Sequence, residues 1–367
     1  MATAFLYIIV SILISLSTTI SNACPPSDRA ALLSFKAALT ETSNLGIFNT
    51  WKGQDCCQNW YGVSCDPVTH QVADINLRGE SKDPIFEKAG RTGYMTGSIS
   101  PSICQLTRLS GLTIADWKGI SGTIPQCISS LQFLRILDLV GNKISGSIPS
   151  GVGRLSRLGV LNLADNELTG NIPRSITNLT SLMHLDIRNN KISGTIPINF
   201  GKLKMLSRVL LSKNKLTGLV PNSISNMKRL SDLDLSVNQL SGPVPDSLGK
   251  MAGLNTLNLD DNLITGQIPL SLISSGISVL NLSSNGFEGY IPDAFGPRSY
   301  FTVMDLSYNK LRGRIPKSIS SAAYVGYLDV SYNHLCGPIP VGEPFDHLEA
   351  SSFLSNDCLC GKPLKAC

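Results

Sequence analysis

Charged and aromatic residues are scarce in this chain of 367 residues, and the missing patterns exclude several classes of function. Only 16% of the residues are charged and 6% are aromatic. The four histidines are scattered, and no G-x-S-x-G, H-E-x-x-H or P-loop pattern occurs. The short run Gly151-Val152-Gly153 fits a turn of a repeat better than a nucleotide-binding loop. We therefore expect no catalytic residue, no metal site and no cofactor.

Cysteine is absent from the whole middle of the chain, between Cys127 and Cys336, and no C-x-x-C pair occurs anywhere. The missing pair argues against zinc and redox sites. An even number of cysteines gathered near the two ends of a chain favours disulfides when the chain folds in an oxidising compartment. The ten are Cys24, Cys56, Cys57, Cys65, Cys104, Cys127, Cys336, Cys358, Cys360 and Cys367.

Residues 1–23 contain no charged side chain, and their apolar stretch ends in small residues just before Cys24. This pattern predicts a secretory signal peptide. An uncleaved membrane anchor is the alternative, but the apolar run is shorter than a full span. No later segment approaches eighteen consecutive apolar residues. We therefore expect a mature chain without a transmembrane segment, located outside the cell or in the cell wall.

The chain repeats itself every 24 residues, as in LRILDLVGNKISGSIPSGVGRLSR followed by LGVLNLADNELTGNIPRSITNLTS. The shared template is L-x-x-L-x-L-x-x-N-x-L-x-G-x-I-P, which is the pattern of leucine-rich repeats. Its asparagines are Asn142, Asn166, Asn190, Asn214, Asn238, Asn262, Asn285, Asn309 and Asn333. The register predicts an α/β solenoid, a right-handed superhelix of about 10–11 repeats.

Each part of the template has a physical reason. In L-x-L both leucines face the core while the intervening residue faces outward, so each repeat contributes one strand to a concave parallel sheet. The buried Asn can bridge backbone groups of successive turns, because its amide both donates and accepts. The Gly and Ile-Pro then turn the chain back across the convex side, where a proline is tolerated.

A solenoid needs a cap at each end, because a single repeat cannot bury its own apolar face. We expect a helical cysteine cap over 24–66, with Ser27 and Asp28 capping its helix. Repeats follow over 67–340, and a second cysteine cap occupies 341–367. A charged insertion over 78–96 interrupts the first repeat. Lys118 lies where the asparagine ladder would begin.

The motif W-x(4)-CC-x-x-W-x-G-V-x-C, from Trp51 to Cys65, resembles the plant extracellular leucine-rich-repeat class. That class includes polygalacturonase-inhibiting proteins and ectodomains of receptor kinases. The resemblance to those inhibitors implies four bridges: Cys24–Cys56, Cys57–Cys65, Cys336–Cys358 and Cys360–Cys367. The remaining two, Cys104 and Cys127, sit in corresponding turns of neighbouring repeats, so we expect a fifth bridge between them.

A closer likeness lies in LRGESKDPIFEKAGRTGYM (77–95), ADWKGISGTIPQCI (115–128) and PFDHLEA (344–350). These stretches resemble the plant family named for DNA-damage repair and toleration. The name is not a reason to expect a repair activity, because a secretory signal and paired cysteines do not fit nuclear work.

Charge is unevenly ordered along the repeats, and neighbours in sequence are neighbours in space in a solenoid. Nine basic and no acidic residues lie between Asp186 and Asp232, whereas acidic residues dominate from Asp232 to Asp305. The sequence therefore predicts a basic belt beside an acidic one. The basic residues are Arg188, Lys191, Lys202, Lys204, Arg208, Lys213, Lys215, Lys228 and Arg229. A polyanion such as demethylated pectin would favour that belt; ordinary surface charge is the alternative.

The outward strand positions also carry a column of carboxylates: Asp138, Asp186, Asp234, Asp305 and Asp329. Acid–base chemistry is one interpretation, but solvated and mutually hydrogen-bonded side chains are the more ordinary one. Strand counting places four aromatic residues, Trp117, Tyr308, Tyr327 and Tyr332, on or at the rim of the concave face. Exposed tyrosines are good anchors for partners, and packing on one another is the alternative.

The candidate contact residues on the concave face are Trp117, His184, Asp186, Arg188, Arg208, Lys213, Asp234, Asp260, Tyr308, Tyr327 and Tyr332. Two glycosylation sequons begin at Asn178 and Asn281, and a glycan on Asn281 would obstruct the concave sheet.

These observations favour a secreted, non-enzymatic recognition protein of the plant cell wall, in defence or wall signalling. Its expected partner is a cell-wall enzyme or a receptor ectodomain, with no nucleic acid expected. The alternatives are a structural wall protein that binds pectin and, less favoured, a DNA-damage toleration role.

Overall fold

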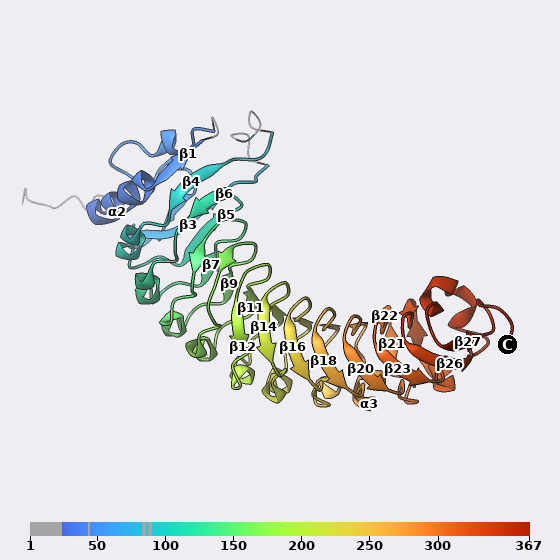
Figure 1. Ribbon diagram of the computed structural model, residues 1–367. Helices are drawn as coiled ribbons and strands as arrows, with labels where there is room; N and C mark the ends of the chain where they lie inside the picture. The colour runs from blue at the N-terminus through green and yellow to red at the C-terminus, as the bar shows by residue number, and fades with distance from the viewer. Residues whose placement is uncertain (1–23, 43–44, 83–85, 87–89) are drawn as a thin grey trace, which may run out of the picture.

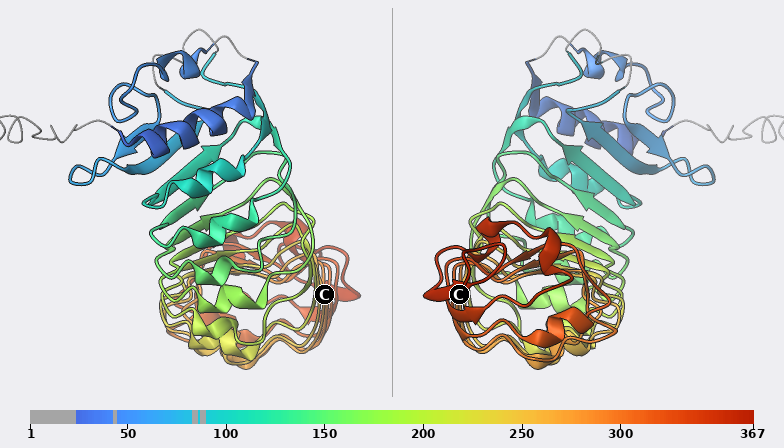
Figure 2. Two further views of the ribbon diagram at one scale, coloured as in Figure 1. Left: turned by 90° about the vertical axis from the view of Figure 1, so that its left-hand side faces the viewer. Right: turned by 90° about the vertical axis from the view of Figure 1, so that its right-hand side faces the viewer.

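The computed structural model describes residues 24–42, 45–82, 86 and 90–367. The predicted signal peptide, residues 1–23, lies outside the described residues. The repeats form a curved solenoid with a cap at each end (Figure 1). Viewed along its length, the solenoid is a stack of similar coils (Figure 2).

The concave face is a 12-stranded sheet in which every neighbouring pair is parallel except the first, β2 with β3. This arrangement confirms the predicted leucine-rich-repeat solenoid. The strands in order are β2 (Val63–Cys65), β3 (Val72–Arg78), β5 (Gly111–Ala115), β7 (Ile136–Asp138), β9 (Val160–Asn162), β11 (His184–Asp186), β13 (Arg208–Leu210), β15 (Asp232–Asp234), β17 (Thr256–Asn258), β19 (Val279–Asn281), β22 (Val303–Asp305) and β25 (Leu328–Asp329).

A second set of parallel strands follows the asparagine of each repeat, and sequence reasoning missed it. Eight of these strands form one sheet: β12 (Ser193–Thr195), β14 (Lys215–Gly218), β16 (Gln239–Gly242), β18 (Leu263–Gly266), β20 (Gly286–Gly289), β23 (Lys310–Gly313), β26 (His334–Pro338) and β27 (Cys358–Cys360). Smaller sheets contain β1 (Leu39–Glu41), β4 (Met95–Ser98) and β6 (Lys118–Ser121), then β8 (Ser145–Gly146) with β10 (Glu167–Leu168), and β21 (Tyr300–Phe301) with β24 (Tyr324–Val325).

Short helical turns complete the repeats. They are η3 (Pro101–Gln105), η4 (Gln126–Ser130), η5 (Val152–Arg154), η6 (Arg174–Asn178), η7 (Phe200–Lys202), η8 (Asn222–Asn226), η9 (Leu248–Lys250), α3 (Leu270–Ile273) and η10 (Lys317–Ser321). The template leucines and isoleucines of strands and turns point inward and form one continuous buried core. Burial of this apolar surface is the main driving force for stacking the repeats.

A ladder of asparagine side chains ties each coil to the coil before it. Asn238 Nδ2 donates to the carbonyl of Leu211 in the preceding repeat and to Leu235 and Ser236 in its own, each at 3.0–3.1 Å. Its Oδ1 accepts from the N–H of Leu216 at 3.0 Å. The ladder continues beyond the predicted asparagines to Asn356 in the C-terminal cap.

The first position of the asparagine ladder was expected at Lys118, but Trp117 occupies it. The Trp117 indole N–H donates to the Leu77 carbonyl at 3.0 Å, as the Asn142 amide does to Ile114 one repeat later. The prediction that Trp117 lies on the concave face was wrong, because its side chain is fully buried. One additional residue between the ladder position and Ile120, compared with later repeats, explains the misplacement of Lys118.

The residue before each ladder position adopts a left-handed conformation, with φ between 51° and 71°. These residues are Asp116, Gly141, Asp165, Asn189, Lys213, Val237, Asp261, Ser284, Tyr308, Tyr332 and Ser355. Glycine, Asn and Asp tolerate this conformation, whereas a β-branched residue is strained there. Val237 is therefore the least suited residue of the series.

The N-terminal cap contains α2 (Pro26–Ala37) and η1 (Ile47–Thr50). Ser27 and Asp28 do not cap α2: the residue before the helix is Pro25, and no side chain caps it. Instead, Asp28 is buried in the first turn and its Oδ2 accepts from the Val72 N–H at 2.9 Å, which joins the cap to β3.

All five expected disulfides are present: Cys24–Cys56, Cys57–Cys65, Cys104–Cys127, Cys336–Cys358 and Cys360–Cys367. The third links the neighbouring turns η3 and η4. The fourth joins the last repeat to the C-terminal cap, which also contains η11 (Phe345–His347) and η12 (Ala350–Phe353).

Replacing Asn238 by Ala should lower the free energy of unfolding by about 2–3 kcal/mol, because the buried Leu216 N–H and the facing carbonyls lose their partner. Urea unfolding followed by circular dichroism measures the loss. Asn226→Ala, at the exposed end of η8, is the control and should change stability little. An equal effect of both substitutions would contradict the ladder's role.

Replacing Val237 by Asn should raise the free energy of unfolding by about 1 kcal/mol, because Asn tolerates the left-handed conformation. The same replacement in extended backbone, Val279→Asn in β19, should not stabilise. A shift of the urea midpoint upward for the first variant alone is the expected result; a downward shift would refute the strain at Val237.

Candidate functional site

The outward side chains of the concave sheet form columns, because the parallel register places equivalent residues of successive repeats side by side. One column runs through Val160, His184, Arg208, Asp232 and Thr256. The next contains Asp138, Asn162, Asp186, Leu210, Asp234, Asn258, Asn281, Asp305 and Asp329. Side chains from many repeats thus line one continuous surface.

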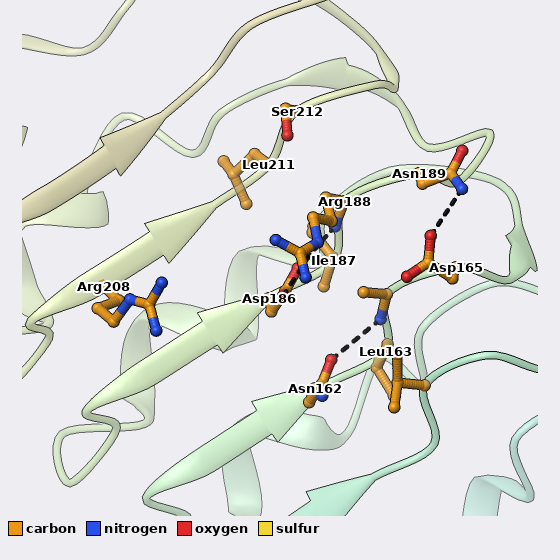
Figure 3. Close-up of polar contacts among 12 residues, drawn as sticks. Asn162, Leu163, Asp165, Asp186, Ile187, Arg188, Asn189, Arg208, Leu211 and Ser212 are labelled. Atoms are coloured by element: carbon orange, nitrogen blue, oxygen red, sulfur yellow. Dashed lines mark hydrogen bonds and ion pairs between the residues drawn. The ribbon is translucent and has the colours of Figure 1, made fainter. Parts of the chain in front are cut away.

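We call His184, Arg188, Arg208 and Lys213 the basic patch, because they lie on β11, β13 and the turns after them. Figure 3 shows Arg208 on β13 and Arg188 in the turn after β11. Arg188 Nε lies 3.5 Å from Asp186 Oδ2, and Arg208 Nε lies 3.1 Å from Asp232 Oδ2. Burial lowers the pKa of His184, and both arginines add to this effect. The two arginines therefore already have carboxylate partners within the sheet.

The carboxylates of this column, all among the described residues, accept hydrogen bonds from backbone N–H groups of their own turns and are not hydrogen-bonded to one another. Asp186 Oδ1 accepts from the Arg188 N–H at 3.1 Å, and Asp234, Asp305 and Asp329 accept in the same way from the N–H two residues later. The expectation of solvated, mutually hydrogen-bonded carboxylates was wrong for Asp138 and Asp186, which are buried. Ionised carboxylates only accept, so a donor in the turn is the better partner.

The C-terminal half of the concave face is acidic and aromatic. We call its exposed or partly exposed residues on β15 to β25 and the turns after them the acidic–tyrosine surface: Asp232, Asp234, Asp260, Asp261, Asp305, Asp329, Tyr308, Tyr327 and Tyr332. The outward positions of these strands and turns carry no Lys or Arg. Within the described part of the chain, the ion pair that offsets negative charge on this surface lies at its edge, between Arg208 and Asp232.

Two residues of this surface have raised pKa values, for which burial is the first cause and neighbouring negative charge the second. Burial raises the pKa of Asp260 to about 6, and the neighbouring carboxylates Asp234, Asp261 and Asp305 contribute. Burial together with Asp329 raises the pKa of Tyr327 to about 12, and Tyr327 Oη donates to Asp329 Oδ2 at 3.2 Å.

Tyr308 and Tyr332 stack on each other at the rim, with ring centroids 4.1 Å apart and planes at 10°. Both still expose about half of their surface, 52% and 48%. Mutual packing and availability to a partner are therefore compatible. A stacked pair is a rigid apolar platform that loses little conformational entropy on binding.

The predicted basic belt is not gathered on one face. Besides the three members in the basic patch, Lys202 lies in η7, Lys204 just after it, and Lys215 in β14 of the second sheet. Lys191 is paired with Glu167 at 2.8 Å. The nine basic residues surround the solenoid, so a flat polyanion cannot contact them all at once.

The two sequons lie on different faces. Asn178 is exposed at the end of η6, and Asn281 is partly exposed on β19 in the concave sheet, where its Oδ1 accepts from Ser283. In the described part of the chain, one cysteine group, Cys24, Cys56 and Cys57, has metal-ligand spacing. All three are disulfide-bonded. Among the described residues, no helix is both long and apolar enough to cross a membrane.

Stacked parallel strands, an asparagine ladder and cysteine caps define an extracellular-type leucine-rich-repeat protein. Family models agree: a leucine-rich repeat region matches residues 128–275, a leucine rich repeat N-terminal domain matches 25–66, and leucine rich repeats match 276–297 and 300–322. The chain belongs to the leucine-rich-repeat family.

Two curated plant proteins show the range of relatives. The DNA damage-repair/toleration protein DRT100 of Arabidopsis thaliana is 57% identical over 145 residues, 39% of this chain and 38% of that protein. A polygalacturonase inhibitor of Vitis vinifera is 31% identical over 121 residues, 33% of this chain and 32% of the inhibitor. The chain thus spans only about a third of the length of these relatives.

Solved structures match over most of the chain. The ectodomain of the Arabidopsis receptor kinase HAESA, in complex with an IDA peptide hormone, has a TM-score of 0.71 and 28% identity, covering 91% of this chain and 53% of the receptor chain. A plant ice-binding protein has a TM-score of 0.66 and 26% identity, covering 94% of this chain and 98% of the ice-binding chain.

Asp260→Asn should stabilise the protein at pH 7 but not near pH 4. The folded-state pKa of about 6 lies above the ordinary value of 3.8. Stability contributed by protonated Asp260 is therefore lost as the pH rises toward 6. Urea midpoints measured from pH 4 to 7 test this. Asp246 is the contrasting control, because hydrogen bonds from Lys250 and Ser271 lower its pKa; Asp246→Asn should destabilise at pH 7. Identical pH profiles for both variants would contradict the assignment.

Proposed function

We propose that the chain is a secreted, non-catalytic recognition protein of the plant cell wall that binds a protein partner on its concave face. The observation that carries this proposal is the acidic–tyrosine surface, where exposed aromatic rings and uncompensated carboxylates adjoin. Carboxylates whose remaining oxygens face solvent are arranged to receive cations, and the tyrosines supply apolar area.

The chemistry of this surface favours a partner segment that carries Lys or Arg. A cationic side chain gains from the carboxylate column and from the faces of Tyr308 and Tyr332. Binding it would also offset the repulsion from Asp234, Asp261 and Asp305, which adds to burial in raising the pKa of Asp260. A segment with acidic residues on one side of the basic ones would extend over the basic patch at β11 and β13.

Similar proteins support recognition rather than catalysis. The HAESA ectodomain is seen with a peptide hormone, and the grapevine relative is named as an inhibitor of a polygalacturonase. Both names describe binding to another polypeptide. For this chain, the proposed partner is a wall enzyme or a receptor ectodomain, and the consequence is inhibition, scaffolding or presentation in defence or wall signalling.

The two alternatives have weaker support. Binding to pectin needs a contiguous cationic face, whereas the basic residues are spread around the solenoid and Arg188 and Arg208 already have acidic partners. A role in DNA-damage toleration, as the name of the Arabidopsis relative suggests for that protein, conflicts with five disulfides, which form in oxidising compartments.

A glycan on Asn281 would restrict the partner. This asparagine lies on β19, near the middle of the acidic–tyrosine surface. An occupied sequon would exclude a bulky partner from β19 and leave the tyrosine end, around β22 and β25, as the contact region. A glycan on Asn178 would leave the concave face free.

The test is affinity capture from plant wall extract with the wild-type protein and with a triple variant, Asp305→Asn, Tyr308→Ala and Tyr332→Ala, followed by mass spectrometry. We expect proteins retained by the wild type to be lost from the triple variant, since both charge and aromatic area are removed. Loss of one such contact residue typically costs about 1–2 kcal/mol.

The matched control is Lys202→Ala with Lys204→Ala, which removes charge at η7 without touching the concave face. It should retain the same proteins as the wild type, and its retention on polygalacturonate tests the pectin alternative. Equal capture by the triple variant would overturn the concave-face proposal.

A further inference from the structure

A pocket of about 550 Å³ lies between the last helical turn of the repeats and the C-terminal cap. Its wall includes Ser320, Tyr324 and Gly326 from the last repeat, and Glu343, Pro344 and His347 from the cap. None of its lining residues belongs to the acidic–tyrosine surface. A volume of this size suits a small ligand or a few residues of a polymer, because such sites measure roughly 300–1,000 Å³.

The ring of Tyr324 is held from two sides. Tyr324 pairs with Tyr300 across β21 and β24, and their rings stack with centroids 5.2 Å apart and planes at 30°. A Cβ on Gly326 would lie 2.9 Å from Tyr324 Cε1, so only glycine leaves room for the ring where it lies. The Tyr324 side chain remains 46% exposed. It is therefore a fixed aromatic surface at the pocket.

Most of the polar side of the pocket comes from η11 and the residues just before it. His347 Nδ1 lies 3.0 Å from Glu343 Oε2, which orients both groups. Phe345 between them is buried and packs on Phe353, with ring centroids 6.3 Å apart. The second carboxylate oxygen of Glu343 and the second nitrogen of His347 remain as hydrogen-bonding positions. The Ser320 hydroxyl adds a third polar group to the wall.

An aromatic ring on one side of the pocket and polar groups on the other indicate which kind of ligand would fit. A pyranose ring has one face of C–H groups, which suits the negative face of an aromatic ring. Its hydroxyl groups are donors for a carboxylate and both donors and acceptors for an imidazole. A uronic acid would bring a second carboxylate into a pocket that already contains Glu343, and like charges repel. The pocket therefore suits a neutral sugar better than an acidic one.

We propose that this pocket between the last repeat and the C-terminal cap binds a neutral pyranose residue of a plant glycan, with Tyr324 as the stacking platform and Glu343 and His347 as hydrogen-bonding partners. The site is separate from the concave face, so the protein would hold a wall glycan at its C-terminal end while the concave face stays available to a protein.

Isothermal titration calorimetry and saturation-transfer NMR test the proposal with the full chain, secreted with its disulfides formed. The probes are cellotetraose, xylotetraose, mannotetraose and galactotetraose, with tetragalacturonate for comparison. We expect at least one neutral tetrasaccharide to bind more tightly than tetragalacturonate. Tyr324→Ala should weaken that binding about tenfold, whereas Tyr324→Phe, which keeps the ring, should change it less.

Two further variants test the rest of the wall. Glu343→Gln should weaken binding of the neutral sugar, because a charged acceptor is replaced by a neutral one. Gly326→Ala should weaken it by displacing the Tyr324 ring. The matched control is Tyr290→Ala, which removes an exposed tyrosine that lines neither the pocket nor the acidic–tyrosine surface and should leave sugar binding unchanged.

Melting temperatures of all variants identify any that fail to fold, and Tyr324→Phe and Glu343→Gln keep the test decisive in that case. The proposal is overturned if no neutral tetrasaccharide binds, if tetragalacturonate binds most tightly, or if binding is the same in Tyr324→Ala, Glu343→Gln and the wild type. Loss of sugar binding without loss of protein capture separates this site from the concave one.

Discussion

The hydrogen bonds of the buried asparagine ladder are the interaction on which the rest of the structure depends. Each amide joins three carbonyls and one N–H of two adjacent coils, as Asn238 does. The buried backbone groups of a sharp turn have no strand partner, and an unpaired buried group is costly. Satisfying them from one side chain fixes the distance and rotation between coils, and so fixes the register of the concave sheet.

That fixed register separates folding from recognition along the same strands. Inward leucines and the ladder hold the coils, so the outward columns are free to carry whatever a partner requires. Even the carboxylates of the second column are positioned by their own turns, as Asp305 is by the Ser307 N–H. The concave face is therefore a rigid display of side chains, with a charge that changes from the basic patch to the acidic–tyrosine surface.

The period was enough to predict the solenoid and its concave sheet, because the 24-residue register repeats many times. It also predicted the Cys104–Cys127 bridge, whereas the other four disulfides were expected from the resemblance to the polygalacturonase-inhibiting proteins. The period failed where one residue breaks that register. Between Trp117 and Ile120 the chain has one additional residue, so strand counting misassigned Trp117 to the surface and Lys118 to the ladder. A tryptophan in the place of Asn was not anticipated, although its indole N–H can donate in the same direction.

Other features were not predicted because no pattern in the sequence indicates them. The strands of the second sheet are only three to five residues long, too short for an alternating pattern to predict them. The buried Asp138 has its partner in Arg78, 60 positions earlier in the chain, whose Nη2 donates to Asp138 Oδ2 at 2.7 Å. The cap pocket joins Tyr324 to Glu343 across the end of the repeats. Such proximities depend on how the cap closes the solenoid.

The central claim, that the acidic–tyrosine surface is where a partner binds, can be tested directly by photocrosslinking. A benzoylphenylalanine placed at Tyr332 on the concave rim, or at the exposed Ile198 on the opposite side, is irradiated in plant wall extract. The account predicts that the probe at Tyr332 crosslinks one protein through a segment containing Lys or Arg, and that the probe at Ile198 does not. Crosslinking of the same protein only from Ile198 would contradict it.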